Sequence, residues 1–135
     1  MENMEIGIAP EKVLFQKNLI VIEESKTRRH RILYKDIVFT YIRTRDDKTG
    51  EYQAPEITDV TGRMDGELIL YDREHRKWII RADRTGQKAG VLFEELCAHA
   101  PYVLAGGQDW FDCSSKEDFE MVREMVELMR ECSRQ

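Results

Sequence analysis

The chain has 135 residues, of which 41% are hydrophobic and 35% are charged, and its formal net charge is −5. This composition is typical of one globular domain over residues 1–135 and excludes a disordered chain, while the negative charge disfavours non-specific binding to nucleic acids. The longest apolar runs, such as Leu19–Ile22 and Val91–Phe93, are far shorter than the roughly 20 residues that cross a bilayer.

The N-terminal residues and the cysteines predict a cytoplasmic protein. Residues Met1–Glu5 are acidic, whereas a secretory signal peptide begins with basic residues and continues with an apolar run. Cys97, Cys113 and Cys132 are odd in number and widely spaced, which favours reduced thiols over a disulfide framework.

Strands are expected between about residues 13 and 82. The first half of this region predicts short strands at Val13–Phe15 and Leu19–Glu23 (two strands or one broken strand), a basic hairpin tip at Ser25–His30, a return at Arg31–Tyr34 and a longer strand at Asp36–Thr44. The longer strand is apolar on both faces, so it is expected to be central and covered on both sides. Its alternation places Ile37, Phe39 and Tyr41 on one face and Val38, Thr40 and Ile42 on the other.

The second half of this region begins with a loop. Residues 45–66 have no clear period, although Tyr52–Thr58 is compatible with an edge strand that tolerates Pro55. Glu67–Tyr71 and Lys77–Ala82 then predict a hairpin whose polar connection suits a type I turn with a bulge.

The C-terminal third predicts two helices. The first covers about residues 87–99 and ends before Pro101, and the second covers about residues 115–133. Ser114 and Glu117 have the spacing of a capping box at the start of the second helix. Its apolar residues occupy half of the circumference, which is wider than the stripe of about 100° that covers a single sheet.

The residues show no established catalytic or metal-binding pattern. Cys97 and His99 would lie on opposite sides of a helix, and no histidine pair has metal-ligand spacing, so no cofactor and no metal are expected. An enzyme with a carboxylate site in loop 45–66, around Asp59, Asp65 and Glu67, is the weakest of the hypotheses considered.

Two surfaces are candidates for binding. One is the basic hairpin tip, where residues 26–45 carry seven Lys or Arg against Asp36 alone. Its ligand-binding candidates for an anionic lipid or a phospholigand are Lys26, Arg28, Arg29 and Arg31. The other is the excess apolar face of the C-terminal helix, with candidate interface residues Met121, Met125, Leu128, Met129 and Cys132.

Two motifs resemble those of known proteins. Arg31-Ile-Leu-Tyr34-Lys-Asp36-Ile37 and Leu92-Phe-Glu-Glu-Leu96-Cys-Ala-His-Ala-Pro101 are similar to segments of uncharacterised small bacterial proteins of the Firmicutes type with pleckstrin-homology-like (PH-like) domains. This resemblance covers about residues 13–133 and implies an antiparallel sheet or partly open barrel followed by a short helix and a long closing helix. It implies a binding or scaffolding module and no enzyme activity. The additional helix before the last one departs from a plain PH domain.

The sequence therefore predicts an α+β, PH-like interaction module that is not an enzyme and that associates with itself through the C-terminal helix or a sheet edge, with another protein as the other possible partner. The alternative hypothesis is a peripheral binder of anionic lipid or phospholigand through the basic tip. The carboxylate enzyme is the second alternative.

Overall fold

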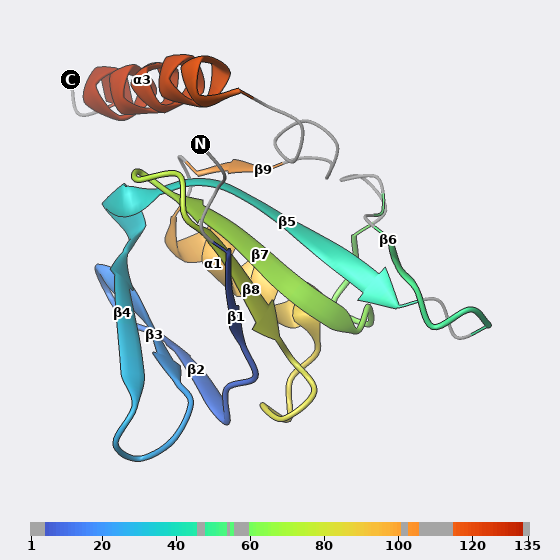
Figure 1. The fold of residues 1–135 in the computed structure, drawn as a ribbon. Coiled ribbons are helices and arrows are strands. Elements are labelled where there is room, and N and C mark those ends of the chain that lie inside the picture. Colours follow the sequence, from blue (N-terminus) through green and yellow to red (C-terminus); the bar gives the residue numbers. More distant parts are fainter. Residues whose placement is uncertain are drawn as a thin grey trace.

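The computed structural model describes residues 5–45, 48–53, 55, 60–100, 103–105 and 115–133, and Figure 1 shows their arrangement. The strands are β1 (Glu5–Ile8), β2 (Lys12–Phe15), β3 (Leu19–Glu23), β4 (Arg29–Leu33), β5 (Ile37–Arg45), β6 (Tyr52–Gln53), β7 (Gly66–Asp72), β8 (Lys77–Arg81) and β9 (Leu104–Ala105). The helical elements are the 3₁₀ turn η1 (Tyr34–Asp36), α1 (Ala89–His99) and α3 (Lys116–Ser133). The α+β class with a long last helix is confirmed.

The larger sheet has the strand order β1-β8-β7-β5-β6, and β9 also pairs with β5. Its centre is the antiparallel set β5, β7 and β8, whereas β1 and β9 run parallel to their neighbours. The predicted hairpin is confirmed, because β7 and β8 pair with Leu68 opposite Ile80 and Leu70 opposite Trp78.

The smaller sheet is the antiparallel set β2-β3-β4. The N-terminal apolar residues form two separate strands, and β4 pairs with β3 through cross-strand neighbours such as Ile20 and Ile32. The tip between β3 and β4 lies at residues 24–28, where Arg28 carbonyl oxygen accepts hydrogen bonds from the amides of Glu24 and Ser25.

The larger sheet is buried on both faces, which confirms the expectation for its central strand. One face shares a core with the smaller sheet and with α1, and the other face packs against α3 (Figure 1). The first core includes Ile20, Ile22, Ile32, Ile37, Leu68, Leu70, Trp78, Ile80, Leu92 and Leu96. The second core is smaller and consists of Val38, Phe39, Tyr41, Ile69, Tyr71, Phe119 and Val126.

The predicted alternation along β5 is wrong at its start. The pairing of β5 with β7 shifts register between Ile37 and Phe39, as at a β-bulge. Val38 and Phe39 therefore both join the core against α3, whereas Ile37 joins the core on the other face with Ile42. An extra residue in one strand reverses the faces of the residues before it, and the amino-acid pattern alone did not indicate it.

Both ends of the chain differ from the sequence-based expectation. Strand β1 lies before the first expected strand and pairs with β8, which is about 70 residues away in the chain. At the start of α3, Ser115 Oγ accepts a hydrogen bond from the amide of Asp118 at 3.1 Å, so the observed cap begins one residue after the predicted capping box. Ser114 lies outside the described residues.

Helix α1 lies between the two sheets, whereas the last helix covers the outer face of the larger sheet. Ala89, Leu92, Phe93 and Leu96 of α1 are all buried. The first turn of α1 approaches the backbone so closely that a Cβ atom on Gly90 would lie 1.8 Å from the carbonyl oxygen of Thr61. Glycine is required there by close packing.

Candidate functional site

The outer side of α3 carries a continuous row of apolar side chains. The exposed fraction is 64% for Met121, 44% for Met125, 60% for Leu128 and 48% for Met129, and Cys132 is also exposed. Steps of three and four residues place these side chains on one side of the helix. They are the five residues that the sequence predicted as an interface, and we call them the α3 apolar face.

Helix α3 contacts the larger sheet through a different part of its circumference. Phe119 and Val126 are buried against β5 and β7, and Val122 is half-buried. At 3.6 residues per turn, these three side chains lie within an arc of about 60°, whereas the α3 apolar face spans about a further 100°. An arc of that width is what a helix uses to cover one surface. The helix therefore has enough apolar surface for a second contact.

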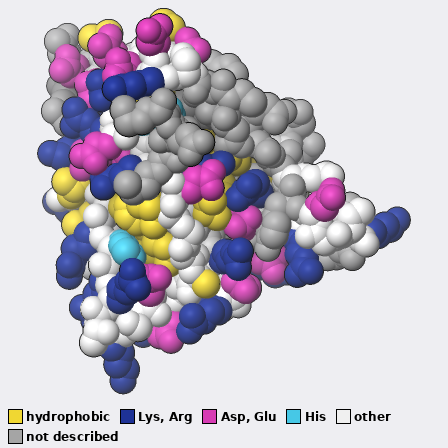
Figure 2. All heavy atoms as spheres, in the orientation of Figure 1, with side chains coloured by type: hydrophobic (Ala, Val, Ile, Leu, Met, Phe, Trp, Pro, Cys, Tyr) yellow, Lys and Arg dark blue, Asp and Glu magenta, His cyan; other side chains and the backbone are white. Residues whose placement is uncertain are grey.

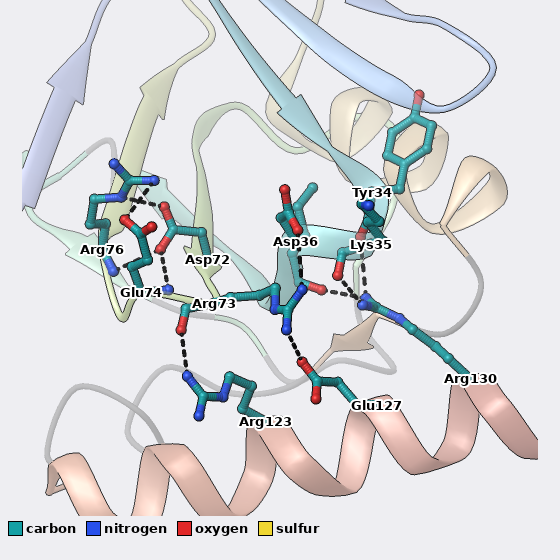
Figure 3. Close-up of polar contacts among 11 residues, drawn as sticks. Tyr34, Lys35, Asp36, Asp72, Arg73, Glu74, Arg76, Arg123, Glu127 and Arg130 are labelled. Atoms are coloured by element: carbon teal, nitrogen blue, oxygen red, sulfur yellow. Dashed lines mark hydrogen bonds and ion pairs between the residues drawn. The ribbon is translucent and has the colours of Figure 1, made fainter.

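One arginine fixes the rotation of α3. The Arg130 guanidinium donates hydrogen bonds to the carbonyl oxygens of Tyr34 at 3.2 Å, of Lys35, and of Ile37 at 2.5 Å (Figure 3). These carbonyls belong to η1 and to the first residue of β5, which precede Arg130 by 93 to 96 residues. A guanidinium offers five N–H donors in a fixed plane, so one side chain holds the helix against this turn.

A second set of polar contacts lies at the turn between β7 and β8. Arg73 forms an ion pair with Glu127 at 2.7 Å and a longer one with Asp36 at 3.7 Å. Its carbonyl oxygen accepts a hydrogen bond from Arg123 at 3.1 Å (Figure 3). These contacts and Arg130 together form what we call the α3 clamp. Arg123 and Arg130 lie in the polar half of this amphipathic helix, but each follows a buried residue (Phe119 or Val126) by four positions and turns toward the body.

The turn beside the clamp contains a polar recess of about 330 Å³. Its lining residues are Asp36, Asp72, Arg73, Glu74, Arg76 and Arg123. Three carboxylates face three guanidinium groups, and Asp72 already accepts hydrogen bonds from Arg76 and from the Trp78 indole at 2.7 and 2.9 Å. The matched charges make this recess part of the structural support of the turn.

His75 joins the same turn to α3. Its ring stacks on Phe119 with centroids 3.9 Å apart and an interplanar angle of 11°. Its φ of 64° lies in the left-handed region, which closes the turn as the predicted bulge requires. Burial lowers the pKa of His75, and the neighbouring Asp72 carboxylate acts in the opposite direction. The neutral ring is therefore the form that suits this contact.

Glutamates line one border of the α3 apolar face. By angle around the helix, the polar sector next to Leu128 holds Glu117, Glu120, Glu124, Glu127 and Glu131. Within the part of the chain that the structure describes, no cation lies within ion-pair distance of the exposed Glu117, Glu124 and Glu131. Figure 2 shows acidic and apolar side chains together at the top of the molecule, where Figure 1 places α3.

The basic tip is partly neutralised by its own hairpin. Arg28 forms an ion pair with Glu24 at 2.9 Å, and Arg29 forms one with Glu23 at 2.8 Å. Lys26 and Arg31 are exposed, and the described residues give them no ion pair. Two of the four predicted ligand-binding cations are thus engaged with carboxylates already.

The carboxylates predicted around loop 45–66 are not gathered at one point as far as the described residues reach. Asp59 lies outside these residues, and Asp65 is exposed beside the amide of Gly66. Glu67 is buried on β7 between Arg43 at 3.3 Å and Arg81 at 3.8 Å. Among the described residues, no group of three histidine, cysteine or acidic side chains is placed to hold a metal ion.

The half-buried Cys97 thiol has no activating environment. Burial raises the pKa of the Cys97 thiol, which disfavours the reactive thiolate. His99 stacks on Phe15 and its Nδ1 lies 2.8 Å from the carbonyl oxygen of Glu95. Cys113 lies outside the described residues.

Comparisons with protein-family models, curated proteins and solved structures gave no match to this chain. Among the described helices, none is both long enough and apolar enough to span a membrane. The functional argument therefore depends on the geometry of the chain itself.

Proposed function

We propose that this chain is a non-catalytic, PH-like interaction module that binds a protein partner through the α3 apolar face. The observation that carries the proposal is the rotation of α3. The α3 clamp directs Arg123 and Arg130 toward the body and leaves Met121, Met125 and Leu128 exposed. Contiguous exposed apolar surface on a small domain is typical of a contact site for another molecule.

The PH-like part of the proposal is supported by the arrangement of the sheets. Two largely antiparallel sheets share one core, and α1 lies between them. The resemblance at residues 31–37 falls on the passage from β4 through η1 into β5, which is the segment that Arg130 of α3 contacts. The segment that carries the resemblance is therefore the segment against which Arg130 orients α3.

A protein partner agrees better with the charges than an anionic lipid surface does. Helices that lie on membranes carry lysine and arginine on their polar face, whereas α3 carries a sector of five glutamates beside its apolar face. At the basic tip, Arg28 and Arg29 are paired with carboxylates. We expect no salt-sensitive sedimentation of the protein with vesicles that contain anionic lipid.

The test places a photo-crosslinking amino acid at position 128 of the full chain in the cells that produce it. Position 17 in the turn between β2 and β3, where Lys17 is exposed, serves as the control. We expect a discrete crosslinked product from position 128 that is absent from position 17 and is lost when Met125→Glu is added. The mass of the product distinguishes a second copy of this chain from another protein. Equal products at both positions, or none at position 128, would contradict the proposal.

A further inference from the structure

We infer that the partner of the α3 apolar face is an amphipathic helix with basic residues along one border of its own apolar stripe. This inference rests on the proposed function and specifies the chemistry of the partner. Three features of α3 carry it: the shape of the exposed row, the residue type in that row, and the charge along its border.

The shape of the row fits a helix. Met121, Met125, Leu128 and Cys132 follow one another in steps of four, three and four residues, as in the seam of two packed helices. The row covers eleven residue steps, or about 16 Å along the axis. A partner helix of about four turns would cover it from end to end.

The residue type favours an adaptable contact. Three of the five side chains of the face are methionines, which are unbranched and polarisable and adjust to partners of different shape. Amphipathic helices are among the peptide elements that dock on exposed apolar surfaces. Leu128, which lies near the middle of the row, adds a large aliphatic side chain to the same face.

The charge along the border disfavours an antiparallel pair of two copies and favours a basic partner. Glu117, Glu124 and Glu131 repeat every seven residues along one border, and no described cation neutralises them. In an antiparallel pair of two α3 helices related by a twofold axis, these borders would lie side by side, so that glutamates would face glutamates. Repulsion between these carboxylates disfavours the pair, whereas lysine or arginine residues at the same seven-residue spacing on a partner helix would complement all three carboxylates.

The experiment measures binding of two synthetic peptides to the full chain by fluorescence anisotropy. Both peptides have four helical turns, the same composition and the same apolar stripe, but one carries three lysines beside the stripe and the other carries them on the opposite face. We expect the first peptide to bind at least about tenfold more tightly at low salt, with the difference reduced at 0.5 M salt.

Two sets of variants locate the contact. Replacing Glu117, Glu124 and Glu131 by Gln should weaken the binding of the first peptide by about tenfold. The matched control replaces the exposed Glu5, Glu51 and Glu94 by Gln, which changes the net charge equally and should leave binding within about twofold. Met125→Glu should abolish binding of both peptides.

Three outcomes would overturn the inference: equal binding of the two peptides, equal effects of the two glutamine sets, or a dimer that forms through the α3 apolar face and excludes both peptides. If the crosslink at position 128 persists while the peptides fail to bind, only the basic partner is wrong. If that crosslink is absent, the proposed function itself fails.

Discussion

The two helices differ in how they use their apolar residues. Helix α1 has 11 residues and buries Ala89, Leu92, Phe93 and Leu96 in the core between the sheets. Helix α3 has 18 residues but fully buries only Phe119 and Val126. The longer and more amphipathic helix is therefore the less buried one, and a wide apolar stripe does not by itself measure how much of a helix is in the core.

The two helices are also held against the sheets by different kinds of contact. Helix α1 is held by packing in a shared core, whereas α3 combines a small apolar contact with hydrogen bonds and ion pairs at its border. Such an attachment should open more easily than the core does. The comparison predicts that mutations at α1 affect the whole fold and that mutations at the α3 clamp affect α3 alone.

The largest effect is expected in the α1 core. Leu96→Ala removes a side chain with no exposed surface and should lower the free energy of unfolding by about 2–5 kcal/mol. Val126→Ala at the α3 contact should cost about 1–2 kcal/mol, because it removes less buried apolar volume. Urea unfolding of both variants measures the difference, and equal costs would contradict the contrast between the helices.

A somewhat smaller effect is expected from close packing at the start of α1. Gly90→Ala would place a Cβ atom 1.8 Å from the Thr61 carbonyl oxygen, so the backbone must move at a cost of about 1–3 kcal/mol. Gly7→Ala is the matched control, because a Cβ atom there meets nothing within 4 Å. Thermal unfolding should show a lower midpoint for the first variant and not for the second.

The α3 clamp should produce a local effect. Arg130→Gln removes the hydrogen bonds to Tyr34, Lys35 and Ile37 and should favour opening of α3 by about 1–2 kcal/mol. Hydrogen exchange should then be faster in α3 and unchanged in α1. The exposed Glu131→Gln serves as control, and faster exchange in both helices of the Arg130 variant would show that they open together.

The smallest effect is expected from pH at His75. Its pKa is lower in the folded protein than in the unfolded chain, because burial disfavours the charged ring. The contribution to stability is therefore complete above the ordinary histidine pKa of about 6.5 and decreases as the pH falls toward the lower folded value. The protection factors of the α3 amides, which allow for the slower intrinsic exchange at low pH, should fall on acidification, and His75→Asn, which tolerates the left-handed backbone, should reduce this dependence. Unchanged acid sensitivity in that variant would exclude His75 as the cause.

Local patterns predicted much of the fold. The alternation of Leu68 and Leu70 with Ile69 and Tyr71 gave the β7–β8 hairpin, and the apolar period of α3 gave its existence and length. Strand β1 was missed because it has four residues and pairs with a strand about 70 positions away. A short segment gains its structure from that distant partner and carries little signal of its own.

The candidate surface could be predicted as a set of residues but not in its orientation. Phe119, Val126, Met125 and Leu128 lie in the same apolar half of the helix, and no periodicity distinguishes buried from exposed members. The distinction comes from Arg130, whose partners are 93 to 96 residues away in the chain. Long-range contacts to backbone carbonyls depend on the fold and leave no local pattern.

The most direct test of the central claim combines stability and contact in one variant, Met125→Glu. If the α3 apolar face serves a partner, the free energy of unfolding of the isolated protein should change by less than about 0.5 kcal/mol, while the crosslink from position 128 should disappear. A loss of about 2 kcal/mol or more in stability would show that Met125 supports the fold. A crosslink that persists in the stable variant would show that the partner contacts another surface.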